Sequence, residues 1–385
     1  MTPRTGPTQS AALGRLPELD ILRGAAIVAV VYLHAYFSPW DVTSHREKTA
    51  MHVIHLFAHG AVPMFLFISG LLMARERPAP FGDFARKKWL RIGLPLAVWM
   101  VAALVYRAWH VDGWGDGTLW KDFALFNVSG QFYYLFVLAL FYAAFFPARG
   151  WSQRRLAWLA AAAFAANLAT IAWYSESTIA GDFATLAYRN PLTWAFFFTF
   201  GMYAGRRWES LEWTRRWLWP GLAAMAALAA LYYVRGERSG YPVSYFSVEV
   251  FLFSCIGLAV YPAIVTSLAQ SALRPALAPL RALGGYAFAI YLVHMPFFIG
   301  FATGELVSES HLQDDYWQLM NGIFIAGFVT ATAAVVALGW LWPWGARMFL
   351  GIEPQRRGRR ARVRSGLFEK PRIAQPRPPM TSADG

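Results

Sequence analysis

The sequence contains ten long apolar stretches, and this feature limits what the chain can fold into. They begin near residues 22, 53, 92, 131, 156, 191, 218, 247, 283 and 319. A helix needs roughly 17 to 25 largely apolar residues to span a bilayer, and the ten stretches meet this length. With 57% hydrophobic and only 15% charged residues, the chain is more apolar than a typical soluble domain. The sequence therefore predicts an all-α integral membrane protein, a bundle of about ten transmembrane helices.

The distribution of Lys and Arg between these stretches predicts how the chain is oriented. Short connections that are rich in Lys and Arg stay in the cytoplasm. If the N-terminus is inside, the inner connections and the tail hold 27 Lys and Arg, whereas the outer connections hold six. The last outer connection carries Glu305, Glu309, Asp314 and Asp315 and no basic residue. We therefore expect both termini in the cytoplasm, which requires an even number of spans and favours ten over nine or eleven.

The chain is expected to form one membrane domain with two polar ends. We expect residues 1–18 to form a cytoplasmic segment, 19–342 the ten-helix domain, and 343–385 a disordered cytoplasmic tail rich in Pro and Arg. The tail either anchors the topology by touching anionic lipid or binds a partner. The polar N-terminal 20 residues lack the apolar core of a removable signal peptide, so the first span is expected to be an uncleaved anchor.

The charge distribution argues against nucleic acid as a partner, and the cysteine content excludes disulfides and cysteine metal sites. The formal charge is +13, but the basic residues fall between the apolar stretches and form no continuous polar face. Nucleic-acid binding is therefore not expected, and membrane lipids are the expected surroundings. Cys255 is the one cysteine and lies within an apolar stretch. It can form neither an intramolecular disulfide nor a cysteine metal cage.

Ionisable residues within the predicted spans are costly to bury and mark candidate functional positions. In the first span His34 follows Arg23 by eleven residues, three helical turns later on nearly the same face. Arg23 then lies near the cytoplasmic boundary, and His34 lies about 16 Å away in the outer half. Asp20 can cap this helix or pair with Arg23, which is otherwise a snorkelling anchor. His294 in the ninth span is a second deep histidine; either histidine alone could be a packing residue.

The second span contains two further pairs of residues that could have a defined role. His55 and His59 lie four residues apart on one helical face, as zinc ligands can. No third or fourth ligand is apparent, and solvated interfacial histidines are commoner, so no metal site is predicted. Ser69 and Gly70 near the inner end are expected to allow close packing of helices.

A basic cluster precedes the third span. Arg86, Lys87, Lys88 and Arg91 place four positive charges within six positions. The cluster is either an anchor at the inner boundary or a binding site for a polyphosphate, such as the nucleotide end of coenzyme A. Lys88 and Arg91 are three residues apart and would share a helical face.

Together these segments resemble the membrane-bound acyltransferase-3 family. The resemblance runs from Leu19 to about Pro296. It rests on four motifs: Arg23 with His34, the Phe-rich stretch that ends at Ser69-Gly70, Lys88-x-x-Arg91 followed by Pro95, and Tyr291-Leu292-Val293-His294. At three places the chain differs from many members. In the second span, Val62-Pro63-Met64 stands where a Gly-Val-Asp stretch often supplies an acidic residue. Gln131 opens the fourth span where a His-Trp-Phe-Leu-like stretch is usual, and Ala287 replaces a serine.

The resemblance implies an O-acyltransferase of the inner membrane with ten core helices. Members acylate sugars, lipopolysaccharide, peptidoglycan or periplasmic glucans. It implies an acyl-CoA donor that enters from the cytoplasm, no permanently bound cofactor, and a carbohydrate or glycolipid acceptor outside the cytoplasm. An acetyl or succinyl group is the expected cargo. His34 is then the essential residue, with Arg23 and His294 as further catalytic candidates, and the donor-binding candidates are Arg86, Lys88 and Arg91.

His34 is expected to act as a general base on the acceptor hydroxyl, with an acylated enzyme as the alternative route. The rival class is a transporter or flippase of a lipid-linked sugar or acyl intermediate, because such proteins also place charges and histidines within spans. The cluster of Lys88 and Arg91 beneath His34 favours chemistry with a phosphorylated donor over passive translocation.

Overall fold

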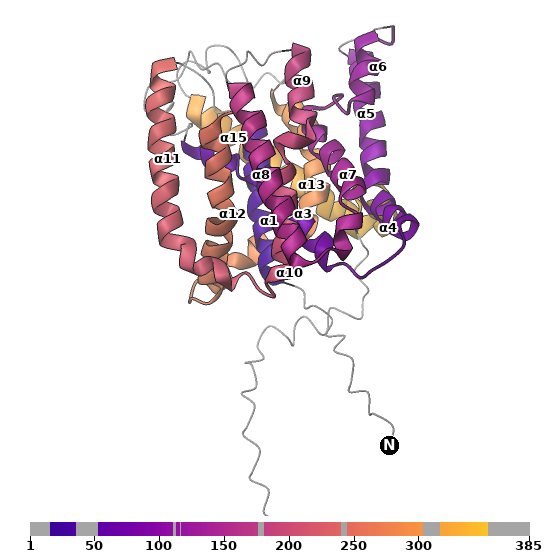
Figure 1. Ribbon diagram of the computed structural model, residues 1–385. Coiled ribbons are helices and arrows are strands. Elements are labelled where there is room, and N and C mark those ends of the chain that lie inside the picture. Colours follow the sequence, from indigo (N-terminus) through magenta and orange to yellow (C-terminus); the bar gives the residue numbers. More distant parts are fainter. Residues whose placement is uncertain are drawn as a thin grey trace, which may run out of the picture. The chain divides into compact units, whose positions relative to one another are not determined.

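A computed structural model describes residues 16–35, 53–110, 113–115, 117–175, 181–239, 245–302 and 316–352, and every element in these ranges is helical (Figure 1). The longer helices are α1 (Pro17–Ala35), α3 (Ala61–Arg75), α5 (Leu94–His110), α8 (Gln153–Ser175), α11 (Leu218–Ser239), α12 (Val248–Ala269), α13 (Ala278–Ala302) and α15 (Tyr316–Leu341). The shorter ones are α4 (Phe81–Lys88), η1 (Trp89–Gly93), α6 (Gly117–Ala124), η2 (Gly130–Phe132), α7 (Tyr133–Ala144), η3 (Pro147–Gly150), α9 (Gly181–Arg189), η4 (Pro191–Thr193), α10 (Ala195–Arg207), η5 (Glu212–Trp217), η6 (Arg274–Leu277) and α16 (Pro343–Leu350).

The ten predicted stretches all contain a helix, and in the described part of the chain seven helices are long and apolar enough to cross a membrane. These seven are Val53–Arg75, Phe81–His110, Gln153–Ser175, Glu212–Arg235, Val248–Ala269, Arg274–Pro296 and Met320–Leu341. The other three stretches contain α1, which carries Glu18, Asp20 and Arg23, and the short helices α7 and α10. The all-helical membrane class is therefore confirmed, and the number ten stays a prediction.

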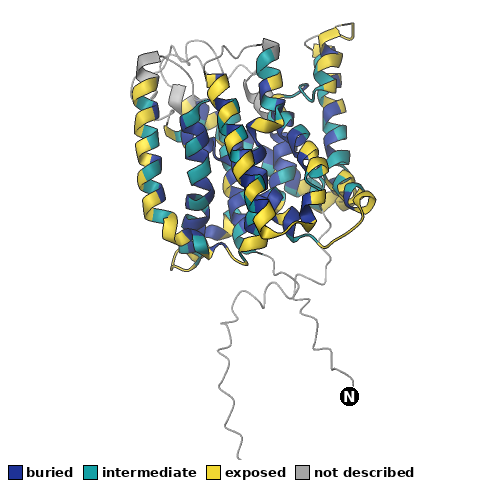
Figure 2. Ribbon diagram, in the orientation of Figure 1, coloured by how far each residue is buried: buried dark blue, intermediate teal, exposed yellow. Residues whose placement is uncertain are grey.

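Burial divides the helices into an inner and an outer group. Phe67, Phe132, Phe198 and Trp194 are among the large side chains that are fully buried in the core. Figure 2 shows α11 with exposed residues along most of its length. Trp219 on this helix is 75% exposed, as suits a side chain that faces lipid in a multi-pass membrane protein.

Glycines bring α1 and α13 into backbone contact. A Cβ added at Gly24 would overlap the carbonyl oxygen of Leu280, and one added at Gly284 would overlap that of Asp20. Only glycine allows such an approach, which is a common basis of helix packing in membranes. The two contacts fix the position of α1 along α13.

A second glycine pair joins α3 and α10. A Cβ at Gly70 would overlap the carbonyl oxygen of Phe198, and one at Gly201 would overlap that of Phe67. The predicted role of Gly70 in close helix packing is therefore confirmed.

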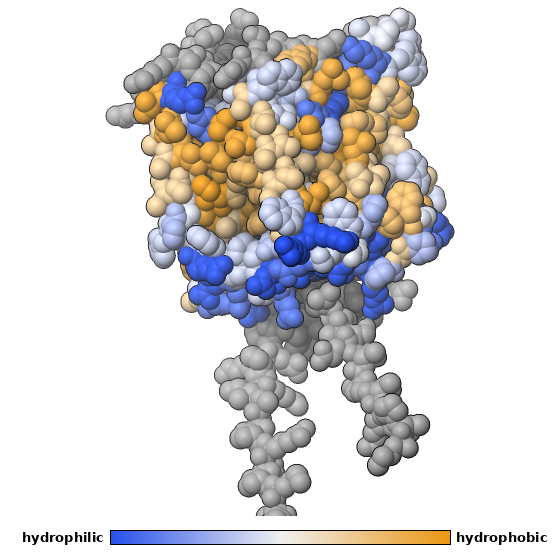
Figure 3. Space-filling model, in the orientation of Figure 1, coloured by the Kyte–Doolittle hydropathy of each residue, from blue (hydrophilic) through white to orange (hydrophobic). Residues whose placement is uncertain are grey.

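The connections predicted to be cytoplasmic lie on one face of the bundle, which we call the basic face. Arg149 Nη2 donates to the Arg77 carbonyl oxygen over 2.6 Å, and Arg206 donates to the carbonyl oxygen of Arg149. These bonds join the connections that follow α3, α7 and α10. Figure 3 shows hydrophilic residues along the lower edge of the molecule, below a broad hydrophobic surface. These three connections therefore lie on the same side of the bundle, and the side of the membrane that they face stays a prediction.

The predicted start of the disordered C-terminal tail, at residue 343, is wrong. Residues 343–350 were expected to be disordered, but they form α16, which packs against α5. Trp99 Nε1 donates to the Phe349 carbonyl oxygen over 2.9 Å, and Gly351 ends the helix at a φ of 65° that favours glycine. Pro343 in the first turn suits a helix start, because its missing N–H needs no partner there. Residues 1–15 and 353–385 lie outside the described part of the chain.

Candidate active site

The two deep histidines, His34 of α1 and His294 of α13, lie side by side. Their ring centroids are 5.2 Å apart, and the ring planes meet at 45°. His34 is half-buried and His294 is fully buried. Because the His34 ring contacts the buried His294 ring, it points into the bundle. Because 260 residues separate them in the sequence, only the packing of α1 on α13 brings them together.

The backbone of α13 fixes the orientation of His294. Its Nδ1 lies 2.8 Å from the Tyr291 carbonyl oxygen and 3.2 Å from that of Ile290. A carbonyl oxygen only accepts hydrogen bonds, so Nδ1 carries the proton, and in the neutral ring Nε2 then carries the lone pair. His294 can therefore accept a hydrogen bond through Nε2.

Tyrosines from α7 and α13 lie beside the histidine pair. The Tyr291 ring is 5.9 Å from that of His294 and 5.7 Å from that of Tyr134. The Tyr291 hydroxyl donates to the Gln131 carbonyl oxygen, and the Tyr134 hydroxyl is hydrogen-bonded to Ser69. Sequence reasoning missed Tyr134 as a site residue, although a polar Gln-Phe-Tyr-Tyr segment within an apolar stretch was a signal that could have found it.

Arg23 lies between these tyrosines and the basic face. It pairs with Asp20 at 3.3 Å, as the spacing of three residues predicted. It also interacts electrostatically with Arg91, Tyr134 and Tyr142. Arg23 is therefore more than a lipid-facing anchor, because it faces groups from two other helices.

Lys88 and Arg23 both lie near Tyr142, and Arg91 lies near Arg23; we call these three cations the basic mouth. Lys88 Nζ lies 4.6 Å from the centroid of the Tyr142 ring, and Arg23 interacts with both Tyr142 and Arg91. Arg86, the remaining donor-binding candidate, is exposed, as is Arg91, whereas Lys88 is half-buried. The structure thus groups Lys88 and Arg91 with Arg23.

A π-helix, η1 (Trp89–Gly93), follows Lys88 and contains Arg91. Such turns are rare and often occur at functional sites, because the inserted residue widens the helix and redirects side chains. Gly93 suits this turn, since a Cβ there would overlap the Trp89 ring. The π-helix therefore distinguishes the mouth of this span from a plain positively charged anchor.

His55 and His59 are not solvated, contrary to the interpretation favoured by the sequence. They are 9% and 7% exposed, and the His59 ring lies 4.3 Å from that of Tyr245. His59 Nδ1 is 2.6 Å from the His55 carbonyl oxygen, so the fold gives this ring a hydrogen-bonding partner on its own helix. Within the described ranges, no group of three His, Cys, Asp or Glu side chains could hold a metal ion.

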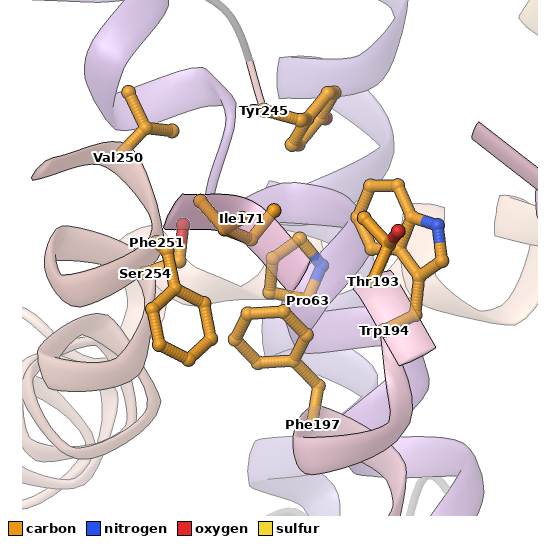
Figure 4. A pocket seen from close by; sticks show the side chains of 9 residues that line it. All are labelled: Pro63, Ile171, Thr193, Trp194, Phe197, Tyr245, Val250, Phe251 and Ser254. Atoms are coloured by element: carbon orange, nitrogen blue, oxygen red, sulfur yellow. The ribbon is translucent and has the colours of Figure 1, made fainter. Parts of the chain in front are cut away.

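A separate small hollow, with about 10 Å³ of space, lies among aromatic side chains (Figure 4). It is lined by Pro63, Ile171, Thr193, Trp194, Phe197, Tyr245, Val250, Phe251 and Ser254. None of these is a predicted site residue, and the hollow is separate from the site around His34 and His294.

Within the described residues, a helical bundle with seven candidate spans defines a multi-pass membrane protein, and His34 and His294 lie side by side inside it. The family model of the acyltransferase domain matches residues 16–340, and the chain therefore belongs to the acyltransferase-3 family. No curated protein and no solved structure matches the chain. The protein is an acyltransferase that uses an acyl donor and an acceptor, and the rival class of transporters is not supported.

Proposed function

We propose that the protein transfers an acyl group, acetyl or succinyl, from cytoplasmic acyl-CoA to a hydroxyl of an extracytoplasmic glycan or glycolipid. In this proposal ten helices span the inner membrane, and both termini and the basic face lie in the cytoplasm. The donor phosphates bind at the basic mouth, with Arg86 at its exposed rim. The thioester reaches His34 through the bundle.

The observation that carries the proposal is the position of the histidine pair above the basic mouth. Arg23 and His34 share α1, and their eleven-residue spacing corresponds to about 16 Å along the helix axis. The extended pantetheine arm of coenzyme A can bridge this length. Interactions run from Arg23 to Tyr134, from Tyr134 to Tyr291, and from Tyr291 to His294. In the proposal these tyrosines line the route of the donor.

In the proposed reaction His34 acts as the general base. It takes the proton from the acceptor hydroxyl while the hydroxyl oxygen attacks the thioester carbonyl carbon. The C–S bond then breaks, and the departing thiolate takes the proton back from the His34 imidazolium. The His294 ring lies beside that of His34, and its Nε2 is the acceptor nitrogen of the ring. In the proposed reaction this nitrogen accepts the second N–H of the His34 imidazolium once His34 has taken the proton, which stabilises the positive charge on His34.

A vesicle experiment tests the direction of transfer. Purified protein is reconstituted in sealed vesicles that expose the basic face outward, with an oligosaccharide acceptor enclosed and isotopically labelled acetyl-CoA or succinyl-CoA added outside. The proposal predicts a labelled ester on the enclosed acceptor, detected by mass spectrometry. Transfer only to an acceptor on the donor's own side would contradict it.

Comparing the envelope glycans of cells with and without the protein would identify the acyl group by its mass.

Replacing Lys88 by alanine should raise the KM for acyl-CoA about tenfold to a hundredfold and change kcat little. A charge-assisted hydrogen bond to a phosphate contributes roughly 1.5–3 kcal/mol, and the lysine binds the carrier away from the reacting bond. Steady-state kinetics with varied donor concentration measures both constants. Arg155→Ala is the control, because it removes an exposed charge from the first turn of α8. An unchanged KM for the Lys88 variant would contradict the donor assignment.

A further inference from the structure

Lys88 is held in place from three sides. Its Nζ lies 5.0 Å from the centroid of the Phe84 ring, 4.6 Å from that of Tyr142, and 3.1 Å from Glu76 Oε2. Two aromatic faces and a carboxylate restrict an ammonium group that is otherwise flexible. The lysine is therefore a fixed anion-binding group, and in this structure its anion is Glu76.

Glu76 binds the neighbouring lysine as well. Its Oε1 pairs with Lys87, so one carboxylate bridges two ammonium groups. Burial alone would raise the pKa of the Glu76 carboxyl, but the two lysines outweigh it and hold this pKa below its ordinary value. Glu76 is therefore ionised at neutral pH and neutralises part of the charge that a phosphate would meet.

The backbone that carries Glu76 is fixed by Arg149. The guanidinium of Arg149 lies over the Phe84 and Phe146 rings, at 5.0 and 5.2 Å from their centroids. Its Nη2 donates to the carbonyl oxygens of Glu76 and Arg77, over 3.2 and 2.6 Å. Arg149 is only 8% exposed. The ion pair of Glu76 and Lys88 thus rests on a buried support, unlike a mobile surface pair.

We propose that the Glu76 carboxylate occupies the anion position of the donor site in the empty enzyme and competes with the donor phosphate for Lys88. This inference rests on the proposed function. Binding of a polyphosphate displaces Glu76 from Lys88, and the return of Glu76 assists the release of spent coenzyme A. The competition also weakens the binding of a singly charged anion more than that of a diphosphate, because a diphosphate brings more charge than the carboxylate it replaces.

Anion binding by Glu76→Gln tests the competition. The variant keeps the size of the side chain and removes its charge, so it should bind inorganic pyrophosphate and coenzyme A about threefold to tenfold more tightly. Isothermal titration calorimetry of the detergent-solubilised protein measures both affinities. Asp83→Asn is the matched control, since it removes an exposed carboxylate from the first turn of α4; its affinities should stay within about twofold of wild type.

The outcomes separate this inference from the proposed function. Unchanged or weaker pyrophosphate binding by Glu76→Gln, in protein that melts at the wild-type temperature, overturns the competition. Glu76→Asp offers a second measurement, because it keeps the charge but withdraws it from Lys88, and its affinity should lie between those of wild type and Glu76→Gln. If Glu76→Gln binds pyrophosphate more tightly while no variant binds coenzyme A, the competition stands and the proposed donor is wrong.

Discussion

Replacing His34 by alanine should lower the rate of acyl transfer by about 10²- to 10⁴-fold, because a general base contributes a factor of this size. The protein should still fold, since the His34 ring is half-buried and its removal leaves α1 packed on α13 through glycine contacts. Initial rates at saturating acyl-CoA measure the effect. His110→Ala, an exposed histidine at the end of α5, is the control and should keep full activity.

Two further measurements make the His34 prediction specific. The KM for acyl-CoA should change little in His34→Ala, because the phosphates bind at the other end of the route. Added imidazole should restore part of the lost rate, since a small base can enter the space that the missing ring leaves. Wild-type activity in a correctly inserted His34→Ala protein would remove His34 from the reaction.

Replacing Gly284 by leucine should destabilise the protein and abolish activity. The side chain would meet the Asp20 carbonyl group, which is backbone and cannot swing aside, so α1 must move away from α13. Overpacking of this kind costs about 1–3 kcal/mol or more, and the movement also separates His34 from His294. Thermal unfolding of the purified protein and its transfer rate measure the two effects.

Gly285→Leu is the matched control for this substitution. Gly285 is the next residue on α13, is exposed, and has open space where a Cβ would lie. The Gly285→Leu protein should keep the melting temperature and the activity of the wild type within the error of the measurement. Equal tolerance of leucine at the two positions would contradict the close approach of α1 and α13.

Hydropathy located the helices well because lipid requires each span to be long and apolar. The alternation of basic connections likewise predicted which of them share a face, as the bonds of Arg149 and Arg206 show. Hydropathy failed at α16, where an eight-residue amphipathic helix follows a span. It also could not show that α7 and α10 are short, because η2 and η4 turns before them belong to the same apolar stretches.

The site was predictable where it follows from spacing along one helix. Arg23 pairs with Asp20 as their separation of three residues indicated, and the eleven-residue spacing put His34 on nearly the same face. The contact between His34 and His294 was beyond sequence reasoning, because it depends on the register of α1 against α13. Glu76 was missed for a similar reason: its partner Lys88 lies on the next helix, twelve residues away, where helical spacing gives no information.

The central claim is that one donor molecule extends from the basic mouth to the histidine pair. A cryo-electron microscopy structure with bound coenzyme A tests it most directly. We expect phosphate oxygens within hydrogen-bonding distance of Lys88 or Arg91, Glu76 displaced from Lys88, and the thiol sulfur beside His34. Coenzyme A bound elsewhere, or bound at Lys88 with its thiol outside the bundle and remote from His34, would contradict it.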